Sequence, residues 1–89
     1  MRLVLLAAAA ALLAGCAGGH STARGRGVFE RSCTSCHTLT GHDTSARGGD
    51  LRAARLTAAD VASFARIMPV RPPLSSADAR AVGRYVVSR

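Results

Sequence analysis

Apolar residues recur with a helical period in three stretches of the chain, and each stretch carries a helix start signal. In the first stretch, Gly25, Phe29 and Cys33 fall on one face behind a cap at Ser21 or Thr22. Glycine costs a helix up to about 1 kcal/mol relative to alanine, so Gly25 indicates the close approach of another backbone or a ring. We therefore predict a first helix that leads into residue 33.

The second stretch begins at a capping box, Thr57-x-x-Asp60. Apolar positions at i, i+3 and i+4 then form its inner face: Val61, Phe64 and Ala65. Pro69 ends this predicted helix, because the residue before a proline is pushed out of the helical region. That residue is Met68, which lies near the apolar face of the helix at i+7 from its first apolar position.

The third stretch follows the stiff Pro72-Pro73 connection and also begins at a capping box, Ser75-x-x-Asp78. Its inward stripe consists of Ala81, Val82, Tyr85 and Val86. The three stretches together predict a small all-α domain of about three helices.

The segment between the first two helices, residues 38–50, shows no period and is rich in Gly, Thr, Ser and Asp, which predicts a loop. His42 lies in this loop beside an aspartate, so we expect it to be solvated. Leu51 follows Gly48-Gly49-Asp50 at the end of the loop and is a candidate to turn inward.

The N-terminus reads as a targeting segment. Arg2 precedes an apolar run over residues 3–13 that is too short to span a bilayer, which predicts an export signal at residues 1–15. The signal closes with Leu13-Ala14-Gly15-Cys16, which resembles the lipobox of bacterial lipoproteins. That resemblance implies an acylated Cys16 as the first mature residue, on the periplasmic side of a membrane. The alternative is an ordinary signal cut near Ala17-Gly18-Gly19 and a soluble product.

The small and polar residues after the signal predict a short tether over residues 16–23, followed by one domain over residues 24–89. The formal charge is +7 at pH 7, with 12 basic residues that are all arginines and 5 acidic residues. This charge suits an anionic membrane surface or an acidic face on a protein partner, and it also fits a merely solvated surface. Nucleic acid is not the expected target, because the arginines are scattered and few aromatic residues are available to stack on bases.

The strongest chemical signal is Cys33-Thr34-Ser35-Cys36-His37, the C-x-x-C-H pattern of covalent haem attachment. On a helical turn the two sulfurs can form thioethers with one porphyrin, while the histidine becomes the proximal iron ligand. A thiol redox centre and a zinc site remain as alternatives. A thioredoxin-like centre requires a longer βαβ scaffold, and zinc would have to recruit His20 and His42, which lack the paired spacing of zinc modules.

These residues add up to a resemblance to the small class I cytochromes c over residues 24–89. The matching features are Gly25-x-x-x-Phe29, the haem motif, Gly48-Gly49-Asp50-Leu51 in place of Gly-Pro-x-Leu, Met68-Pro69, and the stretch from Leu74 to Tyr85. Gly49 departs from the family, which has a proline here whose carbonyl holds the proximal histidine. The stretch from the haem motif to Met68 is shorter than is usual, which predicts an exposed haem edge.

The resemblance implies a covalent haem c bound by Cys33 and Cys36, with iron between His37 and Met68 and with Leu51 against the haem. It also implies packing of Gly25 against Tyr85, and a one-electron carrier rather than an enzyme, working with redox protein partners. If Met68 does not bind, the alternative is an open iron that binds small ligands or reacts with peroxide. The haem would also complete the core, since so few aromatics bury too little area to offset the entropy of ordering about 65 residues.

Overall fold

The computed structural model describes residues 22–88 of the chain. The predicted export signal, Cys16, His20 and most of the predicted tether lie outside the described residues. The N-terminal helix covers residues 22–32 of the described part, α2 spans Ala58–Ala65, and α3 spans Ser76–Val87. Within the described residues the only β contact is an isolated parallel bridge between Thr38 and Asp50. The expectation of a small all-α domain of three helices is confirmed.

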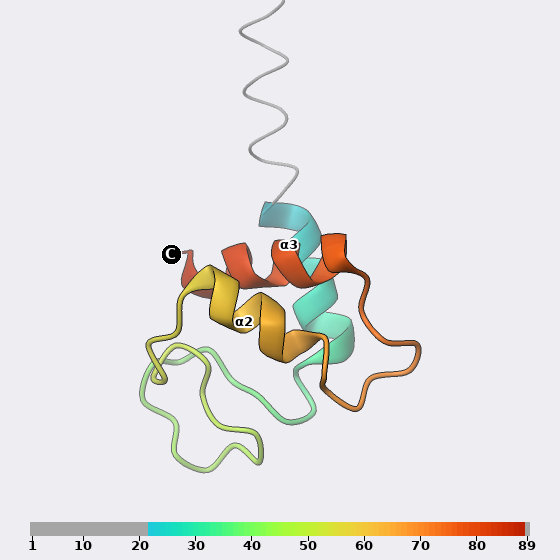
Figure 1. The fold of residues 1–89 in the computed structure, drawn as a ribbon. Helices are drawn as coiled ribbons and strands as arrows, with labels where there is room; N and C mark the ends of the chain where they lie inside the picture. Colours follow the sequence, from blue (N-terminus) through green and yellow to red (C-terminus); the bar gives the residue numbers. More distant parts are fainter. Residues whose placement is uncertain (1–21, 89) are drawn as a thin grey trace, which may run out of the picture.

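In Figure 1 the segment between the N-terminal helix and α2 lies below the helices, and the connection between α2 and α3 loops out at the right. Helices α2 and α3 run side by side in opposite directions, and the N-terminal helix crosses α3. Glycines mark both helix contacts, because a Cβ at Gly83 would clash with the Ala58 carbonyl oxygen of α2, and a Cβ at Gly25 would lie 2.7 Å from the Tyr85 Cβ. The expected contact of Gly25 with Tyr85 is therefore present, and Phe29 extends it with ring centroids 5.9 Å apart.

The core lies where the three helices meet, and apart from Phe29 its members are small. The central cluster contains Val28, Phe29, Val61, Val82 and Val86. Partly buried apolar residues surround it on the side of the loops: Cys33, Leu39, Leu51, Leu56, Ala65, Leu74 and Tyr85. Among residues 22–88, no helix has the length and apolar character needed to cross a membrane.

The helix caps largely follow the sequence, with one exception. The box at Thr57 and Asp60 is complete, because each side chain bonds the backbone of the other residue. At α3, the Ser75 hydroxyl accepts from the Asp78 backbone N–H. The predicted second box is nevertheless only half formed, because the Asp78 carboxylate pairs with Arg24 at 2.8 Å and thereby ties α3 to the N-terminal helix.

Helix α2 ends at Ala65, earlier than the proline alone predicts. A proline at position 69 has no N–H to bond the Ala65 carbonyl, so the last helical turn loses its support. The chain instead turns where the Ile67 N–H bonds the Phe64 carbonyl at 3.1 Å. Met68 thus lies on the connection between α2 and α3, which we name the Met68 loop (residues 66–75). The connection that follows the cysteine motif is named the polar loop (residues 38–55).

Candidate functional site

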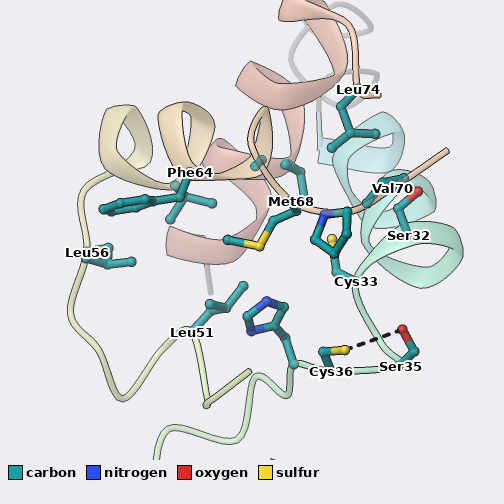
Figure 2. A pocket seen from close by; sticks show the side chains of 15 residues that line it. Ser32, Cys33, Ser35, Cys36, Leu51, Leu56, Phe64, Met68, Val70 and Leu74 are labelled. Atoms are coloured by element: carbon teal, nitrogen blue, oxygen red, sulfur yellow. Dashed lines mark hydrogen bonds between the residues drawn. The ribbon is translucent and has the colours of Figure 1, made fainter. Parts of the chain in front are cut away.

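One cavity lies between the end of the N-terminal helix, α2 and the two loops (Figure 2). Most of its lining is apolar and comes from segments far apart in the sequence. Among the lining residues are all the predicted haem-binding residues, Cys33, Cys36, His37, Leu51 and Met68, together with Phe64. His42 is exposed and does not line the cavity, in agreement with its predicted solvation. The structure therefore brings together every predicted site residue that it describes.

The cysteine motif continues the N-terminal helix as a turn. The Cys33 N–H bonds the Phe29 carbonyl at 2.9 Å, and the His37 N–H bonds the Cys33 carbonyl at 2.9 Å. Ser35 points its hydroxyl toward the Cys36 sulfur at 3.9 Å (Figure 2). This turn presents two thiols and one imidazole to the same cavity from five consecutive residues.

The environment of Cys33 does not activate its thiol. Burial raises the pKa of the Cys33 thiol above its ordinary value of 9.0. Redox-active thiols depend on the opposite shift, because the thiolate is the reactive form. Both described cysteines, Cys33 and Cys36, are free thiols. Among residues 22–88, no three side chains of His, Cys, Asp or Glu are grouped so that they could hold a metal ion.

The imidazole of His37 is held from behind by the polar loop. Its Nδ1 lies 3.1 Å from the Gly49 carbonyl oxygen. A carbonyl can only accept, so Nδ1 carries the proton and the Nε2 lone pair stays available to a metal. In the family that the sequence resembles, a proline carbonyl at this position bonds the histidine. Here the Gly49 carbonyl makes the same hydrogen bond.

Two glycines make this approach possible. A Cβ at Gly48 would lie 2.5 Å from His37 Cε1, so no other residue fits against the imidazole. Gly49 has φ +85°, a left-handed conformation that proline cannot adopt because its ring fixes φ near −65°. The sequence Gly-Gly is therefore the form that this particular turn requires.

Asp50 is the functional residue that sequence analysis missed. It is buried, with 5% of its surface exposed, and it follows Gly49 directly. Its carboxylate accepts hydrogen bonds from the Thr38 and Thr40 hydroxyls and from the backbone N–H groups of Gly41, Arg52 and Ala53. Burial alone would raise the pKa of Asp50, but these bonds outweigh it and hold the pKa well below its ordinary value. An acidic residue after two glycines in a polar loop was the only available signal.

Met68 reaches the cavity from the opposite side of the site. Figure 2 shows its thioether extending from the Met68 loop over the cavity toward Leu51. The side chain is 37% exposed, and Phe64 beside it on the lining is 49% exposed. Phe64 was predicted to lie on the inner face of α2, and it does face the cavity. About half of its surface is nevertheless left uncovered by the protein.

This set of groups fits an iron porphyrin. Two thiols at helical spacing can form thioethers, an imidazole with a free Nε2 can bind iron, and a thioether is the second ligand found in many haem carriers. The apolar lining provides the surface that a porphyrin requires, and the Gly48 position leaves room at the imidazole only because it lacks a Cβ.

Comparison with known proteins gives one match. No curated protein and no solved structure matches the chain. Residues 20–86, which cover about three quarters of the sequence, match the family described as cytochrome c oxidase, cbb3-type, subunit III. The chain therefore belongs to this family and carries its cytochrome c domain, which implies a haem c and a role as an electron-transfer protein.

Proposed function

We propose that the protein is a one-electron carrier whose haem c is attached to Cys33 and Cys36, with His37 and Met68 as the two axial iron ligands. One observation carries this proposal: a single apolar cavity is lined by both thiols, by an imidazole whose Nδ1 is already bonded to Gly49, and by the Met68 thioether. When bound, the haem supplies one-electron chemistry between the ferric and ferrous states of its iron.

The residues of the chain then set the properties of that centre. His37 and Met68 would both hold the iron of a bound haem, which would leave no ligand position for a substrate. A methionine ligand raises the reduction potential, and the hydrogen bond of His37 to the Gly49 carbonyl increases the basicity of the imidazole. Leu51, Leu56 and the apolar lining from α2 would shield a bound haem from water over part of its surface.

We further propose that the carrier works in a bacterial periplasmic electron-transfer chain, and the family name suggests a chain that is linked to an oxidase. The formal charge is +7 for the whole chain and +6 without Arg2 of the proposed export signal, and it favours a redox partner with an acidic docking face, because opposite charges steer encounters at low salt. Two exposed apolar side chains, Phe64 and Ile67, lie next to Met68 and provide a surface for contact with that partner.

For the N-terminus we propose three features: residues 1–15 are an export signal, Cys16 is acylated, and residues 16–23 form a tether. Each buried methylene contributes about 0.8 kcal/mol, so two or three acyl chains would anchor the protein durably. Substitution Cys16→Ser should move haem-containing protein from the membrane to the soluble periplasmic fraction or stall its processing. Wild-type protein that is already soluble after cell fractionation would favour the ordinary signal.

The test of the main proposal starts with protein produced together with a cytochrome c maturation system. A pyridine haemochrome spectrum should report haem bound through two thioethers, and the ferric protein should show the weak band of methionine ligation near the red edge of the visible spectrum. Met68→Ala should abolish this band, lower the reduction potential and let the ferrous iron bind carbon monoxide.

Ile67→Ala is the matched control for Met68→Ala. Ile67 is the neighbouring residue, is 76% exposed and does not line the cavity, so its truncation should leave the band and the potential unchanged. Wild-type ferrous protein that binds carbon monoxide rapidly would replace the electron-carrier proposal by the open-iron alternative. A spectrum without haem would overturn both.

A further inference from the structure

We propose that Asp50 is the positioning residue for the proximal ligand: its carboxylate fixes the Gly49–Asp50 peptide, whose carbonyl oxygen accepts the hydrogen bond from His37. This inference rests on the proposed ligation of haem iron by His37. It adds a residue outside the attachment motif, whose side chain acts only through the backbone next to it.

The starting point is that two glycines cannot hold a carbonyl in one direction by themselves. Glycine has the widest choice of backbone conformations, and Gly48-Gly49 is the most permissive pair a chain can offer. The Gly49 carbonyl nevertheless lies 3.1 Å from His37 Nδ1. Its direction must therefore be set by the residues that flank the pair.

The two oxygens of Asp50 hold two different segments. Oδ1 accepts from the N–H groups of Arg52 at 2.9 Å and Ala53 at 3.1 Å, which ties Asp50 to the turn that follows it. Oδ2 accepts from the Thr38 hydroxyl at 3.1 Å, the Gly41 N–H at 2.9 Å, and the Thr40 hydroxyl. The carboxylate thus joins both ends of the polar loop at one buried point.

This point is one peptide bond away from the carbonyl that holds the imidazole. The Gly49 carbonyl carbon is bonded to the Asp50 nitrogen, and the peptide unit is planar, so fixing Asp50 fixes the plane of that carbonyl. Backbone bonds hold the surroundings, since the Leu51 N–H bonds the Thr38 carbonyl at 2.9 Å and the Gly48 N–H bonds the Cys36 carbonyl. Asp50 therefore provides by side-chain bonding the rigidity that a proline ring would otherwise provide by restricting φ.

The experiment uses the haem-loaded full chain and two variants of the Asp50 cluster. Asp50→Asn keeps one acceptor oxygen and replaces the other by an NH2 group, so it cannot serve both segments. Thr40→Val removes one donor to Oδ2 from an exposed position with little change in shape. The two readouts are the solvent-exchange rate of the His37 Nδ1 proton, measured by NMR on the ferrous protein, and the reduction potential.

In Asp50→Asn we expect the Nδ1 proton to exchange at least about tenfold faster and the potential to become more positive, because a less basic imidazole stabilises ferric iron less. A shift of about 59 mV corresponds to a tenfold change in the ratio of ferrous to ferric protein for one electron. Thr40→Val should move both readouts in the same direction by a smaller amount. If Asp50→Asn does not fold, the same two readouts are measured on Thr40→Val and Thr38→Val, and faster exchange with a more positive potential supports the inference.

Asp60→Asn is the matched control, since the Asp60 carboxylate also accepts a bond from local backbone but lies in α2, outside the cavity lining. It should leave the exchange rate and the potential as in the wild type. Equal shifts in Asp60→Asn, or unchanged readouts in the folded variants of the Asp50 cluster, would overturn the inference. A wild type without haem would instead overturn the proposed function, and the inference with it.

Discussion

The two loops beside the cavity are built in opposite ways. The polar loop is held by hydrogen bonds that converge on buried Asp50, and it fixes His37 from behind. The Met68 loop has few bonds of its own, such as the Val70 N–H to the Met68 carbonyl at 2.8 Å, and it leaves Met68 37% exposed. Its stiffness comes from three prolines that restrict φ.

This difference means that the position of His37 is set mainly by the protein, whereas the position of Met68 depends more on the cofactor. The histidine side is preorganised by the chain, so its geometry is set by protein contacts that can be changed one at a time. The methionine side is stiff but weakly attached, so its final position depends on what fills the cavity.

The largest effect should come from the double substitution Cys33→Ser and Cys36→Ser, which removes both covalent links to haem. We expect a chain without cooperative folding, because the core of small residues cannot offset the entropy of ordering the chain. Circular dichroism should show little helix and no thermal transition, in contrast to wild type matured in the same cells. A helical apo-domain with a cooperative transition would contradict the prediction.

The next largest effect should come from Gly48→Ala on the histidine side. The new Cβ would lie 2.5 Å from His37 Cε1, so either the ring or the polar loop must move, at a cost of about 1–3 kcal/mol in the free energy of unfolding. Urea unfolding of the haem-loaded protein measures this cost.

Gly27→Ala is the matched control for Gly48→Ala. Gly27 lies in the N-terminal helix, and its Cβ would meet only the flexible Arg31 guanidinium at 3.1 Å. This change should be neutral or stabilise the protein by up to about 1 kcal/mol, because alanine favours the helix. Equal destabilisation by both changes would mean that the His37 contact is not what matters.

A smaller effect should appear when acid removes the charge of Asp50. The pKa of Asp50 is lower in the folded state than its ordinary value of 3.8, so the folded protein binds this proton less readily than the unfolded chain. The resulting stability is present above that ordinary value, which applies to the unfolded chain, and is lost as pH falls toward the folded pKa.

Urea midpoints measured between pH 7 and pH 3 test this dependence. The wild type should lose more stability below about pH 4 than Asp50→Asn, whose amide does not titrate. Hydrogen bonds from Ser45 also lower the pKa of Asp43, so part of the acid sensitivity should remain in the variant. Identical pH profiles for the two proteins would show that Asp50 does not carry this stability.

The smallest effect should come from Arg66→Ala on the methionine side. Arg66 donates to the Ser76 hydroxyl at 2.7 Å, but the bond is exposed to water. We expect a loss below about 0.5 kcal/mol and an unchanged reduction potential. A loss comparable to that of Gly48→Ala would show that the two loops are more alike than their hydrogen bonds indicate.

The sequence predicted the parts of this structure that depend on local signals. Periodicity and caps located the helices, and the spacing of Cys33, Cys36 and His37 predicted three residues that line one cavity. The role of Asp50 could not be predicted, because it depends on donors from residues 38–41 that reach the carboxylate only once the loop has folded. The exposure of Phe64 was also not predictable, since an apolar residue on an inner helix face is normally covered by protein.

The Asp50 cluster also bears on the order in which the chain assembles. Its contact with Thr38 closes a segment of 12 positions, whereas the Arg24–Asp78 pair that joins the N-terminal helix to α3 spans 54. Loop-closure entropy makes the longer closure costlier by about 1.3 kcal/mol. We therefore expect the histidine pocket to form early, directly after the cysteine motif, and the docking of the last helix to limit the folding rate.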